Sequence, residues 1–337
     1  MNSSITSFDT ARTAASRFLV SFSIVVLVLA LTTFWLVLPI APQFTGNASF
    51  DQKLLFLRQH PPRPDKTLTL AIGSSMALNN LDTDLIEAAS GKATLNLGVW
   101  GMSLQDTSRL ASQIEQIYPV ADIILATQFF EMRDKPQTNF VISDDALRAY
   151  LSNPSPLAGL SYRDFYAELR LRQNWQKKYA NPRSYMNLSF TRTGAVPLAI
   201  PHDAIAPSRW NPQEDFDPAC RNCMEEINAL CRKTLGQGRS FTVVLPPLTH
   251  WIMEHRPEIK AIHDDRERRL LATLKQCGGA FFDAATWGDF DDSCFADFAH
   301  LNAEGMKKMT DLFVAWRSDS GQLQRRLILC NSKQGGS

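Results

Sequence analysis

The sequence lacks an excess of charge of either sign. Its 337 residues include 35 lysine and arginine and 34 aspartate and glutamate side chains, which leaves a net charge of +1. A balance of this kind creates no field that would recruit nucleic acid, so we expect no nucleic-acid partner. Hydrophobic residues at 45% and charged residues at 20% are ordinary for a globular protein. They exclude a wholly disordered, collagen-like or disulfide-dense chain.

A complete set of zinc ligands is also lacking. Cys220 and Cys223 form one Cys-x-x-Cys pair, but no second pair and no closely spaced histidine accompanies it. On a helix, Cys220, Cys223, Ile227 and Cys231 would form one apolar stripe. The stripe favours core packing or disulfide pairing over a metal or redox site, and it leaves the pairing open. We expect neither a metal nor a cofactor.

One long apolar run stands out from this average composition. Residues 18–38 carry no charge, and as a helix these 21 residues would extend about 31 Å, the thickness of a bilayer's hydrocarbon core. A secretory signal has a shorter apolar stretch, and a core helix is seldom apolar on every face. We therefore predict a retained transmembrane anchor at 18–40. Arg12 and Arg17 precede it, so the positive-inside tendency places the tail at 1–17 in the cytoplasm and the main domain outside.

Beyond the anchor, short apolar stretches alternate with helical patterns. Strands are predicted at 67–72, 93–97, 121–127, 240–245 and 280–283, and helices at 82–89, 103–118, 258–276 and 302–316. This alternation favours an α/β fold in which helices cover both faces of a mainly parallel sheet, with functional groups at the strands' carboxyl ends. The predicted organisation is a juxtamembrane linker at 41–66, a domain at 67–320 with an insertion at about 134–212, and a C-terminal tail at 321–337.

Basic and aromatic side chains are interleaved within the insertion. The basic residues are Arg163, Arg170, Arg172, Lys177, Lys178 and Arg183, and the aromatic ones are Tyr162, Phe165, Tyr166, Trp175, Tyr179 and Tyr185. Such a set could hold a sugar chain or an anionic headgroup. It is equally typical of an amphipathic helix that buries its rings and solvates its charges, and the sequence leaves both interpretations open.

Three distant residues have the types that nucleophilic acyl chemistry requires, namely a hydroxyl, an imidazole base and a carboxylate. Ser75 follows a predicted strand, where Gly73 permits a tight exit. Asp297 lies three residues before His300, just ahead of a helix that Asn302 can cap. Taken singly, Gly-Ser-Ser is ordinary turn chemistry and Asp-x-x-His is a capped turn. Together they predict a Ser-His-Asp site.

These segments resemble the SGNH, or GDSL-like, hydrolase superfamily over roughly half of the chain, at 67–135 and 238–318. The matching blocks are Gly73-Ser74-Ser75, the segment from Asn96 to Gly101, and Asp297-x-x-His300. The third family block differs, because Ala126-Thr127-Gln128-Phe129 stands where the family has Gly-x-Asn-Asp. The asparagine that binds the oxyanion is therefore absent, and the loss of one such donor costs about 2.7 to 4 kcal/mol of transition-state stabilisation.

The resemblance implies a flavodoxin-like three-layer α/β/α domain and a set of residue roles. Ser75 would be the nucleophile, His300 the general base and acid, and Asp297 the residue that orients the imidazole. Backbone N–H groups of Ser75 and Gly101 would bind the oxyanion, with Gln128 as a substitute for the missing asparagine. Trp100 and His250 are further candidates for substrate contact, although packing beside Trp251 is the alternative for His250.

Members with one N-terminal span and an outside domain are similar to components of alginate O-acetylation and teichoic-acid D-alanylation. The resemblance thus implies an esterase or O-acyltransferase on a bacterial-type inner membrane, with its domain in the periplasm. It would use an acyl donor and a polysaccharide acceptor, beside a multispanning membrane acyltransferase. The alternative is a catalytically weak or inactive assembly or polymer-binding partner on the same fold, which the missing asparagine favours.

Overall fold

The computed structural model describes residues 3–37, 44–45, 47–63, 65–132, 142–152, 179–201, 204–205, 207–211 and 222–334. Five strands form one parallel sheet in the order β2-β1-β3-β4-β5. The strands are β1 (Leu68–Gly73), β2 (Thr94–Asn96), β3 (Val120–Ala126), β4 (Ser240–Leu245) and β5 (Ala280–Asp283). This is the flavodoxin-like order, in which ligands bind where the strand order reverses, outside the carboxyl ends of β1 and β3. The predicted α/β fold is confirmed.

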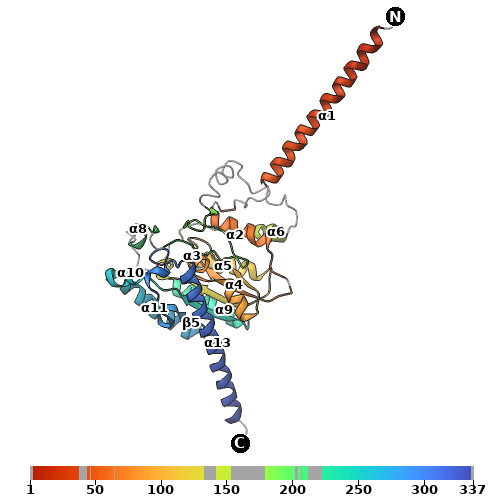
Figure 1. The fold of residues 1–337 in the computed structure, drawn as a ribbon. Coiled ribbons are helices and arrows are strands. Elements are labelled where there is room, and N and C mark those ends of the chain that lie inside the picture. Colours follow the sequence, from red (N-terminus) through yellow and green to blue (C-terminus); the bar gives the residue numbers. More distant parts are fainter. Residues whose placement is uncertain are drawn as a thin grey trace.

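Two separate cores lie on the two faces of the sheet, because successive strand residues point to opposite sides. On one face Leu70, Ile72 and Val243 pack with residues of α2 (Ala48–Gln59), α5 (Leu104–Glu115) and α9 (Cys223–Gly236). On the other face Ala71 and Val244 pack with residues of α3 (Ser75–Asn80), α4 (Thr83–Ser90) and α13 (Ala303–Gln334). Figure 1 shows these helices around the sheet. The three-layer prediction is therefore confirmed.

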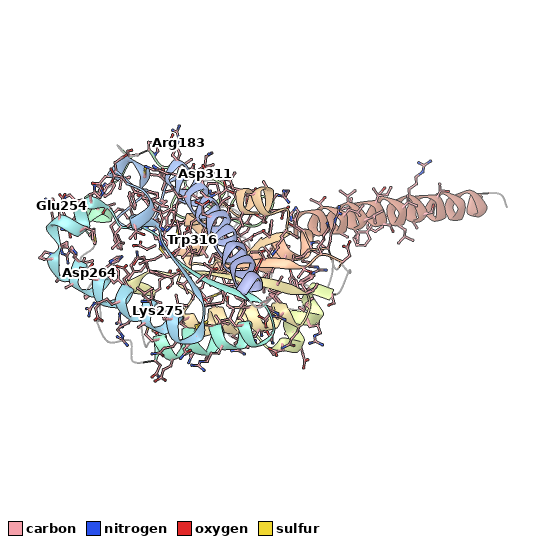
Figure 2. The ribbon with its side chains drawn as sticks, turned by 90° about the horizontal axis from the view of Figure 1, so that it is seen from below. Arg183, Glu254, Asp264, Lys275, Asp311 and Trp316 are labelled. Atoms are coloured by element: carbon pink, nitrogen blue, oxygen red, sulfur yellow. A yellow bond between two sulfur atoms is a disulfide. The ribbon has the colours of Figure 1, made fainter. Side chains whose placement is uncertain are left out.

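Smaller elements connect this framework. They are η1 (Phe129–Glu131), α6 (Asp144–Ser152), α8 (Pro207–Trp210), α10 (His250–His255), α11 (Pro257–Cys277), α12 (Ala284–Trp287) and η5 (Asp292–Cys294). An aromatic cluster joins β5 to α13, because the ring of Phe282 lies 5.4 Å from those of Phe313 and Trp316. Trp316 is labelled on α13 in Figure 2. This cluster fixes the helix that follows the Asp297–His300 segment.

Helix α1 (Ser3–Val37) projects from the body of the molecule (Figure 1). Its stretch from Thr13 to Thr33 is long and apolar enough to cross a membrane, and none of it is buried against the rest of the chain. This helix is compatible with a single-pass anchor and with a signal sequence. The apolar helix predicted near the N-terminus is therefore present.

The linker predicted at 41–66 is wrong over α2, which is a packed helix. Asn47 caps it by accepting hydrogen bonds from the backbone N–H groups of Ser49 and Phe50, and Phe50, Leu54 and Leu57 are buried in the core. This helix could not be predicted from the sequence because three of its buried residues, Ser49, Asp51 and Lys53, are polar. Polar residues inside the fold interrupt the apolar stripe by which an amphipathic helix is recognised.

The predicted C-terminal tail and the predicted insertion are the two remaining segments. Helix α13 continues to Gln334, so the predicted tail at 321–337 is helical up to that residue. The predicted insertion at 134–212 is described in part. Of its basic and aromatic residues named above, only Tyr179, Arg183 and Tyr185 belong to the described residues.

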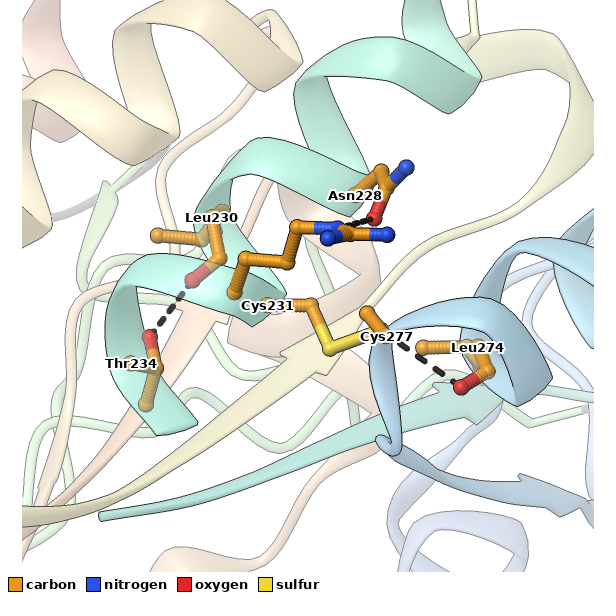
Figure 3. Close-up of a disulfide and its surroundings, with 7 residues drawn as sticks. Asn228, Leu230, Cys231, Thr234, Leu274 and Cys277 are labelled. Atoms are coloured by element: carbon orange, nitrogen blue, oxygen red, sulfur yellow. Dashed lines mark hydrogen bonds between the residues drawn. A yellow bond between two sulfur atoms is a disulfide. The ribbon is translucent and has the colours of Figure 1, made fainter. Parts of the chain in front are cut away.

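Cysteines join two helices of the first core. Cys231 of α9 and Cys277 at the end of α11 form a disulfide across 46 residues of sequence (Figure 3). Cys223 is also disulfide-bonded, and Cys220 lies outside the described residues. Cys294 is buried and free. The apolar cysteine stripe is thus used for packing and crosslinking.

Candidate active site

Ser75 lies at a sharp turn between β1 and α3. Gly73 ends the strand with φ at 142°, and a Cβ at this position would lie 2.2 Å from the carbonyl oxygen of Ala126 in β3. Only glycine permits both the backbone angle and this close approach. Ser74 caps α3 by accepting a hydrogen bond from the backbone N–H of Met76 at 3.4 Å. The turn therefore places Ser75 as the first residue of a helix, at the carboxyl edge of the sheet.

His300 and Asp297 reach Ser75 from the other end of the chain. His300 Nε2 lies 2.8 Å from Ser75 Oγ, a contact across 225 residues of sequence. On the other side of the ring, His300 Nδ1 lies 2.8 Å from Asp297 Oδ2. When Nδ1 carries the ring proton, the Nδ1–H group donates a hydrogen bond to Asp297. Nε2 then carries no proton and accepts a hydrogen bond from the hydroxyl of Ser75. The structure thus brings the three predicted residues together in one hydrogen-bonded chain.

Asp297 is buried, with its side chain only 4% exposed. Burial opposes its ionisation, but the facing His300 and the backbone N–H groups of Ala299 and His300 outweigh burial and lower the pKa of Asp297. The two backbone N–H groups donate to Oδ1 at 3.0 Å and 2.7 Å. A carboxylate held in this way stays charged, and its charge favours a proton on the imidazole during a reaction.

Asn80, at the end of α3, fixes the loop that carries His300. Its Nδ2 donates to the carbonyl oxygen of Ala299 at 3.2 Å, and its Oδ1 accepts from the N–H of Leu301 at 2.9 Å. Asn80 is fully buried, and it joins the helix that begins with Ser75 to the loop that holds the imidazole. Sequence reasoning missed this residue. The only local signal was its place at the end of the short helix Ser75–Asn80, five residues after the serine.

Gly101 and Gln128, both predicted to bind the oxyanion, have different surroundings. Gly101 ends the segment that follows β2, with φ at 68°, in the left-handed region that favours glycine. Gln128 is fully buried. Its Nε2 donates to the carbonyl oxygen of Pro246 at 2.6 Å, and its Oε1 accepts from the N–H of Phe129 at 2.9 Å. Because the amide caps η1 and ties it to the end of β4, we leave Gln128 out of the oxyanion site.

Glu131 is a buried acid next to this turn, at the end of η1. Burial raises its pKa to about 8, although the hydroxyl of Thr127 and the backbone N–H groups of Gln128 and Met76 act in the opposite direction. Since Met76 follows Ser75, this carboxyl lies beside the start of α3. At neutral pH most of it is protonated, so it adds no full negative charge next to the serine. Sequence reasoning did not select this residue.

The two predicted substrate contacts lie in different places. Trp100 is half-buried in the loop that ends at Gly101. His250 begins α10 with its side chain 56% exposed, and its Nε2 lies 3.3 Å from Asp289 Oδ1. His250 lines a cavity of about 460 Å³ together with Trp287 and Phe290. The backbone N–H of Thr249 donates to the carbonyl oxygen of Phe298 at 3.1 Å, which connects this cavity's edge to the Asp297–His300 loop.

One group within the described residues has a composition suited to a metal ion. It comprises His263, Asp264 and Glu267 on α11. Lys260 already lies 2.6 Å from Asp264 Oδ2, so an ammonium group occupies part of this cluster. It does not include the serine, the imidazole or the aspartate of the site. A Ser-His-Asp arrangement carries out acyl chemistry without requiring a metal.

No protein-family model and no curated protein matches the chain. Among solved structures, it resembles the lipase/acylhydrolase from Enterococcus faecalis at 13% identity over 76% of this chain and 96% of that one, with a TM-score of 0.40. It also resembles Est24, a carbohydrate acetylesterase from Sinorhizobium meliloti, at 12% identity over 75% and 99%, with a TM-score of 0.40. A GDSL-like lipase from Bacteroides thetaiotaomicron matches at 10% identity over 77% and 91%, with a TM-score of 0.37. Because the sequence identities and TM-scores are this low, the chemistry of the site must be inferred from its own side chains.

Proposed function

We propose that the protein is a serine acyl esterase or O-acyltransferase anchored in a membrane by α1, with a cell-envelope or exported polysaccharide as its acceptor or substrate. The observation that carries the proposal is the contact of 2.8 Å between His300 Nε2 and Ser75 Oγ, with the same imidazole bonded to the buried carboxylate of Asp297. Hydroxyl, base and orienting acid in this order are what nucleophilic acyl transfer requires.

In the proposed reaction Ser75 Oγ attacks the carbonyl carbon of an ester, and its proton passes to His300 Nε2. Asp297 stabilises the imidazolium that forms. Backbone N–H groups of Ser75 and Gly101 hold the negative oxygen of the tetrahedral intermediate. The leaving alcohol takes the proton from His300, which leaves Ser75 acylated. Water or a sugar hydroxyl then gives its proton to His300 and attacks the acyl carbon. The bond between that carbon and Ser75 Oγ breaks, and His300 returns the proton to Ser75 Oγ.

Three features support the acceptor and the location. The cavity beside the Asp297–His300 loop presents the ring of Trp287, 46% exposed, together with His250 and Asp289. An aromatic face combined with polar side chains is suited to a sugar ring. Helix α1 has the length and hydropathy of a membrane span, and the disulfide between Cys231 and Cys277 suits an oxidising compartment outside the cytoplasm.

The test uses the full chain purified in detergent. Hydrolysis of p-nitrophenyl acetate and labelling by a serine-directed fluorophosphonate are measured for the wild type, Ser75→Ala and Ser74→Ala. We expect Ser75→Ala to lose both signals. Ser74→Ala is the matched control, because it removes the neighbouring hydroxyl, 3.3 Å from Ser75 Oγ, and should still be labelled. Equal labelling of the wild type and Ser75→Ala would refute the proposal.

A second assay separates an enzyme from an inactive assembly partner. The gene is deleted, and acylation of the envelope polysaccharide is measured after complementation with the wild type, Ser75→Ala or His300→Ala. Loss of acyl groups with both variants supports the proposal. Full restoration by both would show that the fold acts as a non-catalytic partner.

A further inference from the structure

Helix α2 holds both backbone polar groups of Trp100, the residue before Gly101. The N–H of Trp100 donates to Ser49 Oγ at 3.0 Å, and Asn47 Nδ2 donates to the carbonyl oxygen of Trp100 at 3.4 Å. Ser49 Oγ in turn donates to Asn47 Oδ1 at 2.7 Å, so the two side chains act as one unit. Ser49 is 1% exposed. Water therefore does not compete for this contact, and the helix fixes the peptide groups on both sides of Trp100.

Helix α2 also holds the start of the segment 96–101, which ends with Trp100 and Gly101. Lys53 Nζ donates to the carbonyl oxygen of Asn96 at 2.9 Å and to that of Gly194, and it lies 4.5 Å from the centre of the Phe190 ring. Lys53 is buried, and no carboxylate faces it among these contacts. Burial lowers the pKa of Lys53 well below its ordinary value. A buried amine needs hydrogen-bond acceptors, and these two carbonyl groups supply them.

Helix α3 holds the segment from its other side. Asn96 Nδ2 donates to the carbonyl oxygen of Ala77 at 2.7 Å, and Asn96 Oδ1 accepts from the N–H of Gly98 at 2.8 Å. A Cβ on Gly98 would lie 2.4 Å from the backbone nitrogen of Leu78, so the segment passes directly against α3. It is thus fixed between α3, which begins with the proposed nucleophile, and α2.

We propose that Asn47 and Ser49 are positioning residues for the oxyanion site, acting through Trp100 on the N–H of Gly101, with Lys53 fixing the start of the same segment. The inference rests on the proposed function. It makes α2, which begins eleven residues after α1 ends, part of the active-site framework. Displacing an oxyanion donor by about 1 Å can lower the reaction rate roughly 100-fold, so small changes in α2 should lower the rate of the reaction.

Two substitutions each remove one of these contacts and leave the helix cap in place. Ser49→Ala deletes the acceptor for the N–H of Trp100, while Asn47 still caps α2. Asn47→Asp keeps the oxygen that accepts from the N–H groups of Ser49 and Phe50, since aspartate caps helices as well as asparagine does. It removes the N–H₂ group that donates to Trp100.

The measurement is steady-state hydrolysis of p-nitrophenyl acetate by the full chain in detergent. We expect Ser49→Ala and Asn47→Asp to lower kcat by about 10-fold to 100-fold, because the oxyanion contact is made in the transition state, with KM changed less than about twofold. The control is Asp82→Ala, which removes the cap of α4 that binds the N–H groups of Asp84 and Leu85. It should lower the melting temperature and leave kcat within about twofold of the wild type.

The outcomes separate the two proposals. If Ser75→Ala is inactive but Ser49→Ala and Asn47→Asp both keep the wild-type kcat, α2 does not position the oxyanion site and the inference is wrong. A fall of kcat in Asp82→Ala equal to that in Ser49→Ala would also overturn it, because loss of stability alone would then explain the effect. If Ser75→Ala is fully active, it is the proposed function that fails.

Discussion

Replacing Asp297 by asparagine tests how the site directs the proton of His300. Asp297 Oδ1 accepts from the backbone N–H groups of Ala299 and His300, while Oδ2 lies 2.8 Å from His300 Nδ1. In Asp297→Asn the amide oxygen must keep the two backbone donors, so the amide nitrogen takes the place of Oδ2. That nitrogen donates, and His300 Nδ1 must then accept.

The proton of the neutral imidazole is consequently moved to Nε2, which faces the hydroxyl of Ser75. A protonated Nε2 cannot accept the serine proton, and the carboxylate charge that stabilised the imidazolium is gone. The equivalent substitution in a serine protease lowers kcat by about 10⁴-fold, which corresponds to about 5.5 kcal/mol of transition-state stabilisation. We expect a loss of this order for Asp297→Asn.

The assay is kcat for p-nitrophenyl acetate, measured beside the melting temperature of the same samples. Because both backbone hydrogen bonds to the residue are kept, the variant should stay folded, with a melting temperature near that of the wild type. A folded Asp297→Asn protein whose kcat lies within tenfold of the wild type would refute the assigned roles of the imidazole and the carboxylate.

Three further predictions concern stability. Because the Cys231–Cys277 disulfide closes a loop of 46 residues, replacing both cysteines by serine should lower the free energy of unfolding by about 4 kcal/mol, measured by urea unfolding; an unchanged midpoint would contradict this. Gly73→Ala should cost about 2 to 5 kcal/mol, because its Cβ would meet a backbone oxygen at 2.2 Å, whereas Gly236→Ala, with nothing within 4 Å, is the tolerated control in thermal unfolding. The raised pKa of Glu131, about 8 against an ordinary 4.5, means that the folded state loses stability as pH rises from 4.5 to 8. Glu131→Gln should remove that loss, so the free energy of unfolding of the variant relative to the wild type should be about 4 kcal/mol higher at pH 8.5 than at pH 5. An equal difference at both pH values would show that the acid is not buried in its neutral form.

The strands could be predicted from the sequence because a strand's apolar pattern depends only on neighbouring residues. The predicted strands at 240–245 and 280–283 coincide with β4 and β5, and the other three agree within two residues at either end. Short apolar stretches that alternate with helical periodicity indicate a parallel sheet on their own. The residue types of the site were likewise visible, since Ser75 follows a strand and Asp297 precedes His300 by three residues.

The roles of the polar residues behind the site could not be predicted in the same way. An amide after β3 looked like a replacement for the missing asparagine, but Gln128 is turned inward by the carbonyl oxygen of Pro246, which belongs to a different strand's end. Asn80 was overlooked because its partners, Ala299 and Leu301, are more than two hundred residues away. Such hydrogen bonds depend on which backbone groups the fold leaves unpaired, and no local pattern records that.

Helix α2 shows the division most clearly. Its N-cap Asn47 and its polar residues Ser49 and Lys53 interrupt the apolar pattern, so the sequence indicated a connector. In the folded chain these residues satisfy backbone groups of Asn96 and Trp100, and burial becomes favourable for them. The five strands, the apolar N-terminal helix and the residue types at the site could be predicted from the chain alone, because each depends on neighbouring residues. Which distant groups meet depends on the folded chain, because a buried polar side chain is stable only where the fold supplies its hydrogen-bonding partner.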